Sequence, residues 1–114
     1  MEELKDLQQF ANTMKRGVLG IDKLITIKTY LPIKDKIKFV QDYRKIVDEH
    51  VKDYDGLEHI VAFVFFNLCV VKEYTNLKLD LTYEEFDILQ EQDLISKITE
   101  KIGADYELLM QFIK

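Results

Sequence analysis

Hydrophobic residues recur every three or four positions over most of the chain, a spacing that predicts amphipathic helices. The first apolar stripe lies in residues 2–16 and consists of Leu4, Leu7, Phe10, Ala11 and Met14. Gly17 and Gly20 then interrupt the pattern. We therefore predict a helical arm at residues 1–16 that precedes a single helical domain at residues 17–114 and can fold back on it or dock on a neighbour.

The segment after the arm has a different pattern. Residues 24–31 alternate apolar with polar side chains and are rich in β-branched residues, which predicts a short extended or β segment. The chain offers it no obvious partner strand. It could pair with a second copy or with a partner's sheet edge, or it could pack on the helices as an extended linker. Ile25 and Ile27 are its candidate contact residues.

Helical periodicity returns after Pro32, whose ring suits the first turn of a helix. An apolar stripe continues through residues 33–52 and ends at a glycine-containing turn. Further along, Thr82 and Glu85 form the T-x-x-E capping box that opens a helix, and two more apolar stripes follow. The pattern predicts an all-α fold, a compact bundle of about five to six helices around one central apolar helix.

The central helix is predicted from residues 60–71, which are apolar except for Asn67. This run is shorter than the roughly 20 apolar residues that a membrane-spanning helix needs. We therefore interpret it as a helix that is buried nearly all round. Its phenylalanines cannot all share one face, because consecutive positions turn by about 100°. Part of this aromatic surface, including Phe63 and Phe66, is expected to meet other helices or another chain.

Composition and charge limit the class of protein. The chain has 114 residues, of which 47% are hydrophobic and 32% are charged, which suits one globular domain. Its net charge of −5 argues against a general nucleic-acid binder. Residues 1–56 carry 11 basic and 10 acidic groups, whereas residues 57–114 carry 5 basic and 11 acidic groups. This asymmetry permits head-to-tail contact between copies, although solvated helix faces would give the same pattern.

Few residues could carry chemistry. The single cysteine, Cys69, excludes a disulfide within the chain and a cysteine-based zinc site. His50 and His59 flank an acidic turn, but an EF-hand register there would place Val51 and Ala62 at ligand positions. No nucleophile motif or nucleotide-binding glycine loop occurs. We predict a protein without catalytic residues, metal site or cofactor, and therefore not an enzyme.

Two short motifs and their order carry a resemblance. Tyr30-Leu31-Pro32 precedes a helix, and Tyr74-Thr75-Asn76 follows the apolar helix. We interpret the first motif as a helix entry and the second as a helix exit. After them comes a helix that contains Tyr83-Glu84-Glu85-Phe86. In this order the stretch from Lys28 to Asp80 resembles small helical proteins of tailed bacteriophages and prophages of Gram-positive hosts.

The resemblance implies a virion or morphogenesis component, such as a head-to-tail connector or a tail-assembly chaperone, in the virion or the host cytoplasm. It implies that the partners are other phage structural proteins or further copies of the chain, and it supplies no catalytic residues. We expect no membrane partner and function through protein–protein contacts. The candidate contact residues are Leu4, Leu7, Phe10, Met14, Ile25, Ile27, Phe63 and Phe66.

Two alternatives stay open. A small acidic inhibitor of a host or defence protein would use the acidic half to imitate a nucleic-acid surface, and salt would weaken its binding. A nucleic-acid-binding regulator would use residues 15–45, which carry nine basic and three acidic side chains. No recognition helix rich in Arg, Asn and Gln is apparent there, which argues against nucleic acid as a partner.

Overall fold

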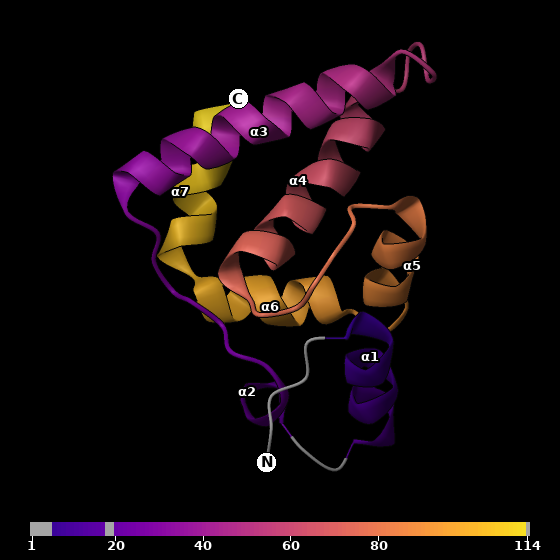
Figure 1. Cartoon of the computed structure of the whole chain (residues 1–114), viewed down its shortest axis with the longest axis vertical. Helices are drawn as coiled ribbons and strands as arrows, with labels where there is room; N and C mark the ends of the chain where they lie inside the picture. The colour runs from indigo at the N-terminus through magenta and orange to yellow at the C-terminus, as the bar shows by residue number, and fades with distance from the viewer. Residues whose placement is uncertain (1–5, 18–19, 114) are drawn as a thin grey trace.

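The computed structural model describes residues 6–17 and 20–113, and over these residues the chain is built from helices with short connections (Figure 1). The helices are α1 Leu7–Arg16, α2 Ile21–Leu24, α3 Ile33–Val51, α4 Glu58–Tyr74, α5 Tyr83–Glu91, α6 Leu94–Ile102 and α7 Ala104–Ile113. The all-α prediction is confirmed. The described helices number seven, against the five to six predicted, and the single-turn α2 accounts for the difference.

Local chemistry explains several helix boundaries. The Asp6 carboxylate accepts a hydrogen bond of 2.9 Å from the backbone N–H of Gln9 and caps α1. Gly17 ends the same helix with a positive φ of 70°, a conformation that glycine adopts without strain. Thr82 and Glu85 form the reciprocal capping box at the start of α5, as the sequence predicts.

The helices form a flat body in which α4 packs against several other helices. The most extensive helix contact joins α3 to α4, and α5 and α6 also pack on α4. In Figure 1, α6 crosses one end of α4, while α7 lies to one side and α5 to the other. The Cα extents are 41 × 30 × 19 Å, so the molecule is little more than two helix layers thick.

Helix α4 is buried to different degrees along its length. All residues from 64 to 71 are buried, including Asn67. The first turns differ, because Ile60 is 50% exposed and Phe63 is 55% exposed. Burial on all sides therefore applies to the second half of the helix and leaves an apolar face open on the first half.

The predicted arm folds back on its own chain over the residues that the structure describes. Helix α1 packs on α5, and its apolar residues Leu7, Phe10 and Ala11 join the single hydrophobic core. The side-chain amide of Gln92 donates a hydrogen bond of 3.0 Å to the carbonyl of Ala11. Residues 1–5 of the predicted arm lie outside the described residues.

The predicted extended segment forms an irregular strap, residues 25–32, rather than a strand. No strand occurs in residues 6–17 or 20–113, where the bridge between Ile27 and Thr75 is isolated. The backbone N–H of Lys28 donates a 2.7 Å hydrogen bond to the carbonyl of Tyr74, the last residue of α4. The strap therefore finds its backbone partner at the end of α4, within the same chain.

Candidate functional site

Most of the predicted contact residues are covered by their own chain. Four of them are buried in its core: Leu7, Phe10, Ile25 and Phe66. Met14 and Ile27 are partly buried against the same core, and Leu4 lies outside the described residues. Phe63 is the predicted contact residue that the structure shows largely exposed. Helical spacing identifies an apolar face, but it cannot say whether the same chain or another chain covers that face.

Phe63 lies at an apolar groove between α3, α4 and α7. The groove has a volume of about 290 Å³. Its lining residues are Tyr43 from α3, His59, Ala62, Phe63 and Phe66 from α4, and Tyr106, Met110 and Ile113 from α7. Aromatic side chains and methionine in such a hollow are typical of protein-binding surfaces.

The walls of the groove are held in place by specific contacts. The Tyr106 hydroxyl donates a hydrogen bond of 3.1 Å to the side-chain carbonyl of Asn67, which joins α7 to α4. The rings of Tyr106 and Phe66 have centroids 5.6 Å apart. On the other side, the exposed ring of Phe63 packs edge-on against Phe86 of α5, with centroids 6.1 Å apart. These contacts orient the aromatic rings before any partner binds.

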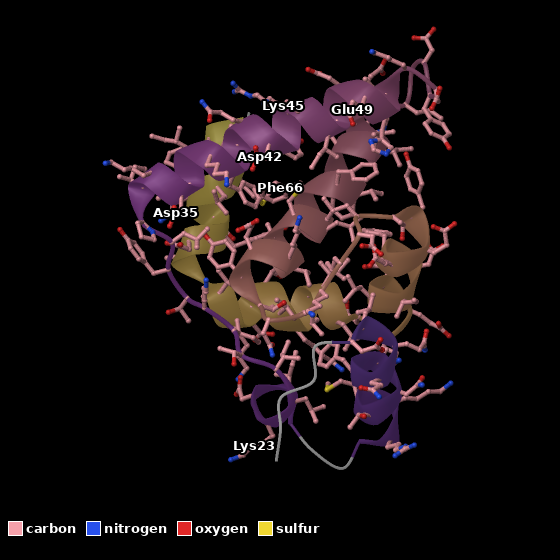
Figure 2. The ribbon with its side chains drawn as sticks, viewed as in Figure 1. Lys23, Asp35, Asp42, Lys45, Glu49 and Phe66 are labelled. Atoms are coloured by element: carbon pink, nitrogen blue, oxygen red, sulfur yellow. The ribbon has the colours of Figure 1, made fainter. Side chains whose placement is uncertain are left out.

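Exposed apolar side chains are concentrated on the helices that form the groove. Within the described helices, large hydrophobic residues with exposed side chains occur on α3, α4 and α7 and not on α1, α2, α5 or α6. They are Ile33, Ile37, Ile60, Phe63, Leu108 and Phe112. Figure 2 shows the contrasting outer face of α3, where Lys45 and Glu49 are exposed, while Phe66 lies in the interior. Of these residues, Phe63 lines the groove and supplies its exposed apolar surface.

Charged groups of both signs act on the groove. Burial raises the pKa of Tyr106, and the neighbouring Glu107 carboxylate raises it further. Burial also raises the pKa of Tyr43, whereas the positive charge of Arg44 lowers it. A partner in the groove would therefore meet an anion near the α7 wall and a cation near the α3 wall.

A buried polar cluster brings the two sequence motifs together. The Lys36 ammonium lies 3.1 Å from one oxygen of Asp105, with side chains that are 2% and 8% exposed. The other Asp105 oxygen accepts hydrogen bonds of 2.8 Å from the backbone N–H of Leu31 and from the Tyr74 hydroxyl. Lys36 also donates to the carbonyl of Leu31. Leu31 and Tyr74 belong to the two motifs, so the helix entry and the helix exit meet at one carboxylate on α7.

The polar cluster determines the charge state of Asp105. Burial raises the pKa of this carboxyl group, but the hydrogen bonds from Leu31, Tyr74 and Lys36, together with the Lys36 charge, lower it by more. The net pKa lies below its usual value, and Asp105 is ionised at neutral pH. Sequence reasoning missed both partners of the ion pair. The available signal was the position of Lys36, three residues before Phe39 on the buried face of α3.

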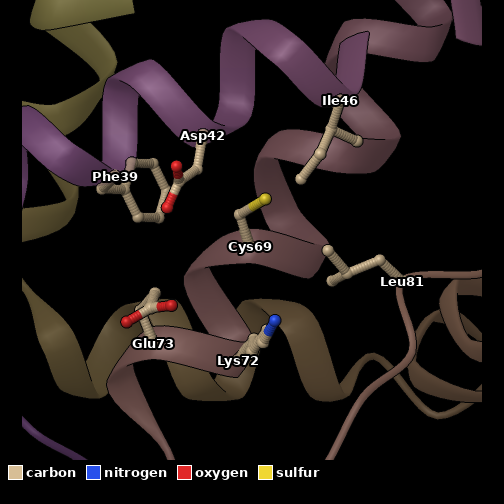
Figure 3. Close-up of a pocket in the computed structure, with 7 residues that line it drawn as sticks. All are labelled: Phe39, Asp42, Ile46, Cys69, Lys72, Glu73 and Leu81. Carbon is tan, nitrogen blue, oxygen red and sulfur yellow. The ribbon is translucent and has the colours of Figure 1, made fainter. Parts of the chain in front are cut away.

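Cys69 is poorly suited to chemistry. It lies beside a small cavity of about 40 Å³, lined by residues of α3 and α4 and by Leu81 (Figure 3). The side chain is buried, and burial raises the pKa of its thiol to about 12. The thiol is therefore protonated at neutral pH, whereas a nucleophile or metal ligand needs the thiolate. The cavity has room for one or two water molecules.

Comparison of the chain with protein-family models, with curated proteins and with solved structures gives no match. In residues 6–17 and 20–113, no group of three or more His, Cys, Asp or Glu side chains is placed to hold a metal ion. None of the helices described is both long and apolar enough to cross a membrane.

Proposed function

We propose that this protein acts by binding another protein chain in the groove between α3, α4 and α7. The observation that carries the proposal is the exposed Phe63 ring beside an apolar hollow of about 290 Å³. An exposed aromatic side chain next to a hollow offers both an anchor and a pocket, which are the features that dominate the energy of protein interfaces. The binding requires no catalytic step.

The context that we propose is phage assembly, as a structural component of the head-to-tail connector or tail-assembly type. The order of the Tyr-Leu-Pro and Tyr-Thr-Asn motifs supports this context. The contacts of Leu31 and Tyr74 with Asp105 give a physical reason for the two motifs to occur together, because each supplies one donor to the same buried carboxylate. A rigid scaffold of this kind suits a virion or morphogenesis protein, whose groove has to keep its shape until the partner arrives.

A photo-crosslinking amino acid at position 63 tests the proposed function. The chain is expressed in the cells that naturally make it, with the crosslinker in place of Phe63 or, as a control, in place of Lys45. Both positions are exposed, but Lys45 lies on the outer face of α3. We expect a discrete protein adduct from position 63 and none from position 45. No protein adduct from position 63, or the same adducts from both positions, would refute the proposal.

A further inference from the structure

We propose that the occupant of the groove is a second copy of this chain, bound about a two-fold axis so that Phe63 of each copy enters the groove of the other. The inference rests on the proposed function, because it names the partner of the same groove. A two-fold contact uses the same surface on both copies, so that surface must carry a projection and a hollow together. Two observations on this face support such a contact.

The first observation is the shape of the groove. Its inner residues Phe66 and Tyr43 are buried, with exposed fractions of 3% and 7%, whereas Phe63 on the same lining is 55% exposed. Phe63 therefore projects from one wall of the groove, and the buried rings of Phe66 and Tyr43 close the floor of the groove. Two such surfaces can interlock, with the projecting ring of one copy in the hollow of the other. The apolar face of α4 that is left open in the monomer would then be covered.

The second observation is the charge around the groove. Glu107 follows the groove residue Tyr106 on α7, and Arg44 follows the groove residue Tyr43 on α3; both charged side chains are exposed. A strongly acidic or strongly basic partner would be attracted by one of these groups and repelled by the other. A second copy carries both signs on the matching surface and can place each near its opposite.

The test measures the mass of the purified full-length chain by light scattering and sedimentation equilibrium over a wide concentration series. The variants are Phe63→Asp, Phe63→Ala and, as the matched control, Ile33→Asp. Ile33 is exposed to the same degree as Phe63, at 54% against 55%, but does not line the groove. Circular dichroism checks that each variant keeps the helical fold, and Phe63→Ala supplies the result if the aspartate variant does not fold.

We expect a monomer–dimer equilibrium for the unchanged chain and for Ile33→Asp. Loss of one anchoring aromatic side chain weakens an interface about 30-fold, and a two-fold dimer loses two, so Phe63→Ala should raise the Kd by about a thousandfold. Phe63→Asp should leave a monomer at every concentration, because the dimer would bury two unpaired carboxylates.

Two outcomes would overturn the inference. The first is an unchanged chain that stays monomeric at all concentrations, and the second is an oligomer that persists unchanged in folded Phe63 variants. Neither result bears on the proposed function, because the crosslinking experiment tests it separately and detects any protein in the groove. An adduct with a different protein, together with a monomeric purified chain, would refute the second copy and keep the proposed function.

Discussion

A single substitution in the ion pair between Lys36 and Asp105 should destabilise the fold strongly. Both side chains are buried, and the ammonium and carboxylate groups lie 3.1 Å apart. The change Lys36→Met keeps much of the length of the side chain and removes its charge. Asp105 would then remain buried with hydrogen bonds from Leu31 and Tyr74 but without a counter-charge.

The expected loss of stability is large. Removing one partner of a buried ion pair costs about 3–5 kcal/mol, because the remaining charge stays away from water. The two remaining hydrogen bonds to Asp105 retain part of its stabilisation, since bonds to charged groups contribute about 1.5–3 kcal/mol each. We therefore expect Lys36→Met to lower the free energy of unfolding by about 3 kcal/mol. Small domains are stable by about 5–15 kcal/mol in total, so the effect is readily measured.

Urea unfolding followed by circular dichroism at neutral pH provides the assay. Lys38→Met is the matched control, because Lys38 is on the same helix and exposed. It should change the stability by less than about 0.5 kcal/mol. In a chain that already carries Lys36→Met, Asp105→Asn should lower the free energy of unfolding by less than it does in the unchanged chain. The reason is that the double variant leaves no unpaired buried charge. A Lys36→Met effect below about 1 kcal/mol, or one equal to that of Lys38→Met, would show that Asp105 does not depend on the Lys36 charge.

Four further predictions concern other parts of the fold. Because the pKa of Asp105 is lowered in the folded state, its contribution to stability is complete above about pH 4 and is lost as the pH falls through the lowered pKa. Acid titration of the unfolding free energy should therefore show a shallower fall for Asp105→Asn than for the unchanged chain, and parallel curves would contradict this. Burial and a pKa of about 12 predict that Cys69 reacts with a disulfide reagent slowly in the folded protein and quickly in guanidinium, so rapid reaction of the native thiol would disprove its burial. Thr82→Ala removes the cap of α5 and should lower the free energy of unfolding in urea by about 1 kcal/mol, whereas no change would show that the capping box adds no stability. Phe10→Ala should cost about 3–5 kcal/mol in the same assay, because the side chain is fully buried, and a cost below about 1 kcal/mol would mean that α1 stands apart as an arm.

Features that depend on interactions between neighbouring residues can be predicted from the amino-acid sequence. The predicted helix at residues 33–52 matches α3, Ile33–Val51, because helical spacing and the proline before it act within a few positions. The capping box of Thr82 and Glu85 was readable for the same reason, since its hydrogen bonds join residues three positions apart. The apolar face of α1 was also correctly located, although not what covers it.

Which apolar and polar groups come into contact depends on how the helices pack. Leu31 and Asp105 are separated by 74 positions, and no local pattern links them. Whether a charged residue on a helix is solvated or paired depends on the distant residues packed over it, as Lys36 shows. The same holds for apolar residues, because Phe10 is covered by its own chain while Phe63 is left exposed. Periodicity depends on the backbone of one helix, whereas burial depends on how all the helices pack, and the groove arises from that packing.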